Sequence, residues 1–338
     1  MKKIRLLWVI LILFLTACST SADTPPEYAP ADQQRLTVYT SHKEEVYMPI
    51  IREFEERTGI WVEVVTGGTN ELLEQIASEQ EAVVADVMFG GGVESLESYK
   101  DCFTPYITTQ SDAISEVFRT DDGLWTPFSA LPVVLAYNTK LVSPDQLTGW
   151  SSLEDPGFCG KIAFADPAVS GSSFTALVTR MFAAGDRSEE ALIQLAHNLQ
   201  GGQLGGSGEV LSAVVDGSCL VGITLEETAL KRIAAGDDLA LVYPADGTSC
   251  VPDGSALVKG APHSENAKKF IDFTVSYEVQ LLLSDQFYRR PIRSDIPAQD
   301  SLLPLEQVAL VDYDVEWASL HRDTILSDWS FFLKEAEE

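Results

Sequence analysis

Short apolar segments alternate with amphipathic segments along most of this 338-residue chain. The stretch 36–59 shows the pattern first. Leu36–Tyr39 has the residue types of a strand, a polar turn follows, and the rest has the apolar spacing of a helix that Gly59 ends. The apolar positions of this helix are Tyr47, Ile50, Ile51 and Phe54. Such alternation predicts an α/β fold in which helices cover both faces of mainly parallel strands.

The alternating units fall into two series, and the chain is too long for one ordinary hydrophobic core. The first series has predicted strands at 36–39, 61–66 and 83–89. The second has predicted strands at 161–165, 219–224 and 239–243, with helices at 174–184, 189–199, 209–215 and 226–235. A further strand at 255–259 and helices at 264–278 and 280–287 follow. Two lobes are therefore expected.

Two segments are predicted to cross between the lobes. The segment 124–138 carries Pro127 and Pro132, which favour a fixed, extended crossing over the centre of a sheet. The segment 246–252 is the expected return. The predicted architecture is therefore two doubly wound sheets joined by two crossing segments. Lobe 1 comprises 36–135 and 253–338, lobe 2 comprises 136–252, and the helices of the tail are expected to pack on lobe 1.

The N-terminus has the features of an export signal. Lys2, Lys3 and Arg5 precede an apolar run at 6–15 that is too short to span a bilayer. The ending Leu-Thr-Ala-Cys resembles the lipobox of bacterial lipoproteins, which implies cleavage of residues 1–17 and acylation of Cys18. An ordinary signal with an incidental cysteine is the alternative. Residues 18–35, polar and proline-containing, are predicted to form a flexible tether from the lipid anchor.

The chain is strongly acidic, with a formal net charge of −28 at pH 7. Removal of the three basic residues of the leader lowers this by three, to −31. A nucleic-acid partner is not expected, because such a partner requires a basic surface. If the ligand is an anion, its site must be a local positive region built from backbone N–H groups and one or two arginines.

Four cysteines follow Cys18, at positions 102, 159, 219 and 250. They form no C-x-x-C motif, which disfavours a zinc ribbon or a thioredoxin-like site. An even number in an exported chain allows disulfides in three connectivities. Cys102–Cys159 with Cys219–Cys250 is the favoured pairing, because each bridge is then local, and buried free thiols are the alternative.

Polar and glycine-rich turns follow several predicted strands and come directly before predicted helices. Ser41 and His42 precede the first helix, Gly91 and Gly92 follow the strand at 83–89, and 170–173 precedes the helix at 174–184. The N-terminus of a helix presents unpaired N–H groups and partial positive charge, so such turns suit an anion. Ser41 as a simple N-cap, and the glycines as a simple bend, are the alternatives.

Five segments together resemble the extracytoplasmic solute-binding proteins of ABC importers. They are VYTSHKEEVYMPIIREFEERTGI, ADVMFGGGVESLESY, KIAFADPAVSGSS, GITLEETA and SALVKGAPHSENAKKFIDF. The likeness covers nearly the whole mature chain. It is greatest to the group labelled ferric-iron-binding, and within that group to the branch of AfuA-type hexose-phosphate binders. It implies the two-lobed periplasmic-binding-protein fold of type II, with a ligand held in the cleft between the lobes.

The residues favour a phosphorylated ligand, such as a sugar phosphate, over iron. Ferric binders of this fold usually present two adjacent tyrosines, and the nearest place here is Phe287-Tyr288. The expected binding residues are Ser41, His42, Gly91, Gly92, Ser170, Gly171, Ser172, Ser173, Gly206, Ser207, Glu226 and Arg290. His42 is expected to titrate near neutral pH. Ferric iron and a phosphonate are the alternatives.

Arg290 and Glu226 are the arginine and the carboxylate of this set. Arg289 and Arg290 could clamp a phosphate, and the resemblance to a segment of the hexose-phosphate binders favours Arg290; a surface pair is the alternative. Glu226 is expected at the cleft edge, accepting bonds from sugar hydroxyls or an amine, with a dipole-stabilised helix start as the alternative. Gly206 and Ser207 stand where that branch carries bulkier polar residues, which puts the sugar itself in doubt.

No catalytic motif is present, since the chain lacks G-x-S-x-G, a Walker A loop and H-E-x-x-H. We therefore expect a binding protein without cofactor or metal, rather than an enzyme. The resemblance implies a monomer outside the cytoplasm, held to the membrane through Cys18. It would capture a small anionic ligand by hinge closure and deliver it to an ABC transporter permease.

Overall fold

The structure is a computed structural model that describes residues 30–200, 202–297, 299 and 302–337. The predicted signal peptide, Cys18 and most of the predicted tether lie outside these residues. The chain divides into two units, 1–33 and 34–338. A short 3-10 helix, Asp32–Gln34, spans the boundary between them. All strands and α-helices of the described residues belong to the second unit.

The first half of this unit is built on three parallel strands. They are β1 (Arg35–Thr40), β2 (Trp61–Thr66) and β3 (Val87–Gly92), with β1 between the other two. The helices between and after them are α1 (Glu44–Thr58), α2 (Thr69–Ser78) and α3 (Val93–Ser98), joined later by α8 (Ser264–Thr274) and α9 (Tyr277–Phe287). As predicted, Gly59 ends α1 in a left-handed conformation, and Ile50 and Phe54 are buried in the core.

The second half repeats the plan. Parallel strands β5 (Ile162–Ala165), β6 (Gln203–Leu204) and β7 (Val221–Leu225) are accompanied by α4 (Gly171–Ala184), α5 (Ser188–Leu199), α6 (Ser207–Val215) and α7 (Glu226–Ala234). The strand β8 (Leu239–Val242) follows α7. The predicted mixed α/β architecture is thus confirmed. Helix α4 begins three residues before its predicted start, so the predicted serine loop forms its first turn.

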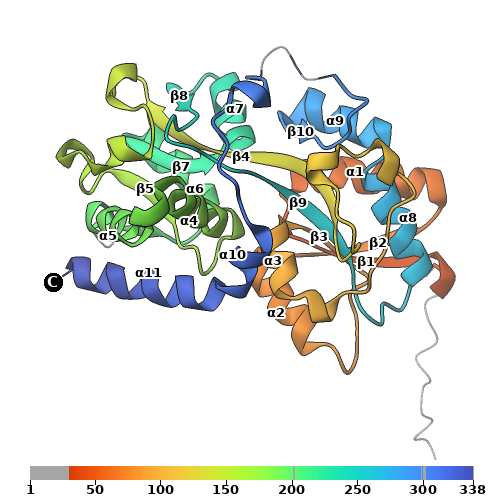
Figure 1. The fold of residues 1–338 in the computed structure, drawn as a ribbon. Coiled ribbons are helices and arrows are strands. Elements are labelled where there is room, and N and C mark those ends of the chain that lie inside the picture. Colours follow the sequence, from red (N-terminus) through yellow and green to blue (C-terminus); the bar gives the residue numbers. More distant parts are fainter. Residues whose placement is uncertain (1–29, 201, 298, 300–301, 338) are drawn as a thin grey trace, which may run out of the picture. The chain divides into compact units, whose positions relative to one another are not determined.

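Two long strands connect the halves, as Figure 1 shows. β4 (Thr126–Asn138) pairs antiparallel with β9 (Cys250–Leu257) along its first part and with β7 and β8 along its second part. The resulting strand order is β2-β1-β3-β9-β4-β7-β5-β6, with β10 (Arg290–Pro291) also on β4. Segment 124–138 was expected to avoid the centre of a sheet. That expectation is wrong, because β4 is buried along its whole length between β9 and β7.

The two prolines of β4 lie where its pairing is irregular. Pro132 is the last residue paired with β9, and the next residue, Val133, pairs with Leu225 of β7. Pro127 lies at a shift of register against β9. A proline cannot donate a ladder hydrogen bond, so these are the positions at which a central strand tolerates one. Pro132 therefore marks the change of partner on β4 between the two halves.

The C-terminal helices contact both halves. α10 (Val315–Leu320) lies beside α3, whereas α11 (Arg322–Glu337) lies beside α5 (Figure 1). Ile325 and Trp329 of α11 belong to the core of the second half, and Trp329 packs edge-on against Phe164 of β5. The expectation that the tail packs on lobe 1 alone is therefore wrong. The apolar face of α11 therefore packs into the hydrophobic core of the second half.

The disulfide prediction is also wrong, because all four cysteines of the described region are free thiols. Three of them lie among apolar side chains: Cys102 beside Phe103, Cys219 against residues of α6 and Cys250 beside Ala130. Cys159 Sγ instead accepts a hydrogen bond from Gln200 Nε2 at 3.1 Å. Burial raises the pKa of the Cys250 thiol to about 12. Buried free thiols are the alternative that the sequence left open; all four thiols are free, and Cys102 is the buried residue among them. Separately, none of the described helices combines the length and apolar character needed to cross a bilayer.

Candidate functional site

A cavity of about 240 Å³ lies where the helix N-termini of both halves meet. Five helices of nine or more residues begin at its wall, namely α1, α2, α4, α6 and α7. Their N-cap residues all line it: Lys43, Gly68, Ser170, Gly206 and Leu225. Gly92, which precedes the short α3, lines it as well. The wall therefore concentrates main-chain N–H groups and the positive ends of helix dipoles.

Glycines in the last part of β3 let the backbone form part of this wall. Gly90 and Gly91 have φ angles of +110° and +91°, a region that favours glycine. A Cβ atom on Gly91 would lie 2.5 Å from the Thr69 methyl carbon, and one on Gly90 would lie 2.8 Å from Ser41 Oγ. Both the backbone conformation and the close packing thus require glycine, so no side chain intervenes between the backbone and the cavity at Gly91.

Ser41 and His42 line the first-half side of the cavity, as the sequence predicted. The His42 ring packs against Phe89 and Phe128, with centroid separations of 4.5 and 5.1 Å. Burial, followed by the nearby Arg289 charge, lowers the pKa of His42 well below 6.5. The expectation that His42 titrates near neutral pH is therefore wrong: the ring is neutral at pH 7. Its buried Nε2 makes no hydrogen bond within the described structure and lies 3.7 Å from Asp253 Oδ2.

On the second-half side, the serines form the first turn of α4. Ser170 is the N-cap, and its side chain accepts a hydrogen bond from the main-chain N–H of Ser173 at 3.3 Å. Gly171 and Ser172 line the cavity with Ser170. Ser173 does not, because its buried hydroxyl donates inward to Ser170 Oγ at 3.1 Å. Ser173 is therefore corrected from a lining residue to part of the helix cap.

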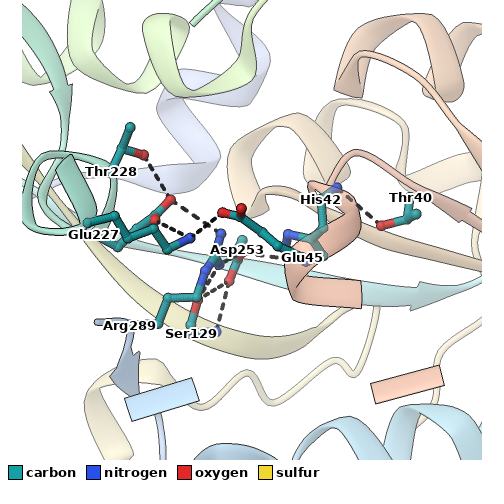
Figure 2. A network of polar contacts seen from close by, with 9 residues as sticks. Thr40, His42, Glu45, Ser129, Glu227, Thr228, Asp253 and Arg289 are labelled. Carbon is teal, nitrogen blue, oxygen red and sulfur yellow. Dashed lines mark hydrogen bonds and ion pairs between the residues drawn. The ribbon is translucent and has the colours of Figure 1, made fainter. Parts of the chain in front are cut away.

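Arg289 is the buried cation of the site (Figure 2). Its Nη1 donates to Asp253 Oδ2 at 2.6 Å and to Ser129 Oγ at 2.8 Å. The main chain and the hydroxyl of Ser129 both donate to Asp253 Oδ1 at 2.8 Å. Arg289 Nε is buried without a hydrogen-bond partner in the described structure. Asp253 and Ser129 thus hold the guanidinium through Nη1, while the Nε–H group remains available to donate a hydrogen bond.

Glu227 faces Arg289 from the second half. Its Oε1 lies 3.5 Å from Arg289 Nη2, longer than a charge-assisted hydrogen bond, and its Oε2 lies 3.1 Å from Lys231 Nζ. The Thr228 hydroxyl donates to it at 2.9 Å. The Arg289 and Lys231 charges hold the pKa of Glu227 below its usual value despite burial, which opposes them. Lys231 also pairs with Glu45 of α1 at 3.0 Å.

Two predicted residues lie outside the cavity wall, each displaced by one position. Glu226 and Arg290 bind one another through two hydrogen bonds of 2.7 Å, and neither lines the cavity. Their sequence neighbours Glu227 and Arg289 line it instead. Successive residues of a helix point about 100° apart. Glu226 and Glu227 therefore point in different directions, and the carboxylate of Glu227 is the one that faces the cavity. Arg290 is corrected from a ligand clamp to the partner of Glu226.

The remaining predicted residues, Gly91, Gly92, Gly206 and Ser207, do line the cavity. Sequence reasoning missed Thr69, Lys231 and Asp253. Thr69 is the first residue of α2 and directly follows the glycine pair after β2, so the rule of position that gave the other turns also applies to it. Asp253 belongs to a crossing strand whose pairing brings it to Ser129. No local pattern in the sequence indicates that register.

The donor set of the cavity does not resemble a ferric site. None of its lining residues in the described part of the chain is a tyrosine, and its carboxylates Asp253 and Glu227 both lie against Arg289. Fe³⁺ prefers oxygen anions such as phenolate and carboxylate that are free to bind it. No group of three or more acidic, cysteine or histidine side chains with metal-ligand geometry occurs among the described residues.

Comparison with known proteins gives a family. A family model described as bacterial extracellular solute-binding protein matches residues 84–315. The chain is 27% identical over 308 residues to iron uptake protein A1 of Synechocystis sp., covering 85% of this chain and 84% of that one. It is 25% identical over 257 residues to a putative 2-aminoethylphosphonate-binding periplasmic protein of Salmonella typhi, covering 73% and 74%.

Solved structures give the same fold. The periplasmic binding protein AfuA from Actinobacillus pleuropneumoniae, with exogenous fructose-6-phosphate bound, superposes with a TM-score of 0.83 over 89% of this chain and 98% of that one, at 24% identity. A ferric binding protein from Campylobacter jejuni superposes with a TM-score of 0.76 over 89% and 99%, at 21% identity. At these identities the likeness concerns the two-lobed fold and leaves the ligand open.

Proposed function

Since this chain belongs to the bacterial extracellular solute-binding proteins, whose members are substrate-binding transport proteins, we propose that it captures a small phosphorylated organic molecule for an ABC importer. The ligand lies in the cavity described above and is held as a phosphoryl or phosphonyl oxyanion. The protein delivers it to the permease and carries out no catalysis. The family, the fold and the position of the cavity are the premises of this proposal.

The convergence of five helix N-termini with one partly free arginine carries the proposal. Main-chain N–H groups at helix starts and a guanidinium are the donors that phosphate oxygens take up in proteins. Ser41, Gly91, Gly92, Ser170, Gly171 and Ser172 surround the oxyanion together with Arg289. Because neutral donors make up most of this set, a dianion can be held without burying an equal number of cations.

The organic part of the ligand meets Glu227, Gly206 and Ser207. The Glu227 carboxylate accepts hydrogen bonds from hydroxyls or pairs with an ammonium group, the role that sequence reasoning gave to Glu226. This polarity suits a sugar phosphate and also an aminoalkylphosphonate. The two relatives named for fructose-6-phosphate and 2-aminoethylphosphonate support a phosphorus oxyanion as the shared feature.

Ferric iron is the second candidate, supported by the relative named iron uptake protein A1. The cavity disfavours it, because the lining described above offers no tyrosine and its two carboxylates face an arginine. An iron complex with a separate anion would fit the helix N-termini better than the bare ion. Ferric citrate is therefore one of the ligands to be tested.

Capture occurs by closure of the two lobes about β4 and β9. The lobes proposed are 36–135 with 253 onward and 136–252, except that α11 moves with the second lobe. Two contacts between the halves support this. Asn70 donates to the main-chain oxygen of Ala168 at 2.6 Å, and Lys231 pairs with Glu45 at 3.0 Å. A ligand that bridges both halves adds contacts available only in the closed arrangement.

The family supports a location outside the cytoplasm. We further propose that the chain is a monomer anchored by a lipid on Cys18 and linked to the folded unit by residues 18–35. Mass spectrometry of the intact protein tests the anchor, which adds the mass of the lipid to a chain that begins at Cys18. An unmodified N-terminus at any other residue would contradict it.

Ligand binding is tested by thermal unfolding of the purified protein. Fructose 6-phosphate, 2-aminoethylphosphonate, inorganic phosphate, Fe³⁺ and ferric citrate are added separately, and the melting temperature is recorded. A ligand at 100 times its Kd stabilises the folded state by about 2.7 kcal/mol, which is readily measured. We expect an organic phosphate or phosphonate to raise the melting temperature. A rise with iron alone would overturn the proposal.

A further inference from the structure

Two adjacent ion pairs join the start of α7 to the start of β10. Glu226 and Glu227 are the first two residues of α7, Arg290 is the first residue of β10, and Arg289 directly precedes it. Arg290 Nε and Nη2 each donate to a Glu226 oxygen at 2.7 Å, which is the two-bond geometry of the strongest arginine–carboxylate contacts. Glu227 and Arg289 are 3.5 Å apart and share no such bond. Glu226 and Arg290 therefore form a tight pair, whereas Glu227 and Arg289 form a loose pair that lines the cavity.

The tight pair is buried and makes further hydrogen bonds to its surroundings. Glu226 is 1% exposed and Arg290 is 6% exposed. The Tyr243 hydroxyl donates to Glu226 Oε1, and Arg290 Nη2 donates to the main-chain oxygen of Leu303 at 2.6 Å. A buried pair with two direct hydrogen bonds and these additional partners holds both side chains in one geometry.

The tight pair also connects strands that lie on either side of the change of partner in β4. Glu226 follows β7, whose last residue pairs with Val133, whereas Arg290 pairs with Ala130. Pro132, where β4 exchanges β9 for β7, lies between these positions. The main-chain N–H of Arg289 is fixed separately, to the Leu283 oxygen of α9 at 3.2 Å. Glu227 and Arg289 are thus each the sequence neighbour of one member of the tight pair.

We propose that Glu226 and Arg290 are positioning residues that set the gap between Glu227 and Arg289 and thereby the affinity for the ligand. This inference rests on the proposed function, because it assigns Arg289 to the oxyanion and Glu227 to the organic part. Loss of the tight pair releases α7 relative to β10, so the two lining groups no longer match one ligand. The pair acts through Arg289 without touching the ligand.

The test is a double-mutant cycle between Glu226→Gln and Arg289→Lys, read as the Kd for whichever organic phosphate or phosphonate the wild type binds. Glu226→Gln keeps the shape of the side chain but removes its charge, and we expect about tenfold weaker binding. In the Arg289→Lys background the same change should weaken binding less than twofold, because the group that it positions is already altered.

A purely structural role predicts a different result. In that case Glu226→Gln lowers the melting temperature of the unliganded protein, and its effect on Kd is either absent or the same in both backgrounds. Glu154→Gln is the matched control. Glu154 pairs with buried Arg180 at a distance of 2.5 Å, and neither residue lines the cavity. The substitution should lower the melting temperature and leave Kd unchanged.

The outcomes separate the two levels of the argument. Binding by the wild type with additive effects in the cycle overturns the positioning role and leaves the proposed function standing. A wild type that binds none of the organic phosphates or phosphonates overturns the proposed function and this inference with it. Non-additive effects with an unchanged Kd in Glu154→Gln support the positioning role.

Discussion

Lys231 of α7 and Glu45 of α1 form an ion pair of 3.0 Å that links the two halves of the molecule beside the cavity. Lys231 reaches inward to Glu227 at 3.1 Å as well, so one ammonium group connects the rim of the site with its interior. The Glu45 side chain is 57% exposed and makes its contact in solvent. Its contribution to the closed arrangement is accordingly small.

Glu45→Gln should weaken ligand binding by at most about fivefold, because an exposed ion pair contributes roughly 0–1 kcal/mol. The loss should appear in the rate of ligand dissociation, measured by stopped flow, and should shrink as the salt concentration rises. Glu53→Gln, on the same helix but paired with Arg57, provides the control and should change nothing. A loss above about fiftyfold would mean that Glu45 contacts the ligand.

Arg289→Met should weaken binding of the phosphorylated ligand about 10- to 100-fold, because it removes charge-assisted hydrogen bonds to the oxyanion. It should also lower the free energy of unfolding by about 3–5 kcal/mol, since Asp253 would remain buried without its partner. Arg289→Met combined with Asp253→Asn should recover most of that stability but none of the binding. Calorimetry and denaturant unfolding separate the two effects; recovery of binding in the double variant would contradict the role of Arg289.

Ser172→Leu should abolish the rise in melting temperature that the ligand produces, because a bulky apolar side chain would occupy the mouth of α4. Ser78→Leu, at the exposed end of α2, is the control and should retain the full rise. The ligand-free melting temperatures of both variants should lie within a few degrees of the wild type, since both sites are at least partly exposed. An undiminished rise in Ser172→Leu would refute the site.

His42 should make the folded state less stable as the pH falls below 6.5. Its pKa in the folded protein is lowered well below that value, so below pH 6.5 the unfolded state takes up a proton that the folded state does not. The free energy of unfolding should then fall by up to about 1.4 kcal/mol per pH unit. His42→Phe should flatten this slope between pH 6.5 and 5, measured by denaturant unfolding. An identical slope in both proteins would contradict the buried neutral ring.

Much of the cavity could be predicted because its elements follow a rule of position. In α/β folds the carboxyl ends of parallel strands and the N-termini of the following helices meet at one edge. Ser41, Gly91 and Ser172 were therefore assignable from the alternation of strands and helices alone, whereas Ser207 came from the resemblance; all four line one cavity. Their role in binding stays a prediction that the experiments above address.

The choice between Glu226 and Glu227, and between Arg289 and Arg290, could not be made from the sequence. The members of each pair are identical and adjacent, so composition and spacing do not distinguish them. The rotation of α7 about its axis decides which carboxylate faces inward, and the conformation after α9 decides which guanidinium does. Tyr288, with a φ angle of +56°, sets that conformation. No local sequence pattern predicts a positive φ at a tyrosine.

The tail and β4 were misassigned for related reasons. The apolar residues of 302–338 have mixed spacing, and only the tertiary contacts of Trp329 reveal which core α11 completes. Prolines usually exclude a segment from the centre of a sheet. Here they coincide with a register shift and with a change of partner strand, which a single sequence does not disclose.

The continuous ladder through β4 and β9 has a consequence for how the molecule can be divided. Neither half possesses a complete sheet of its own, because the strand that closes one continues directly into the other. An excised half would expose a long, unpaired and apolar strand edge, the kind of surface that promotes aggregation. The protein must therefore be expressed, evolved and engineered as one piece, with any cut or insertion confined to the loops outside these two strands.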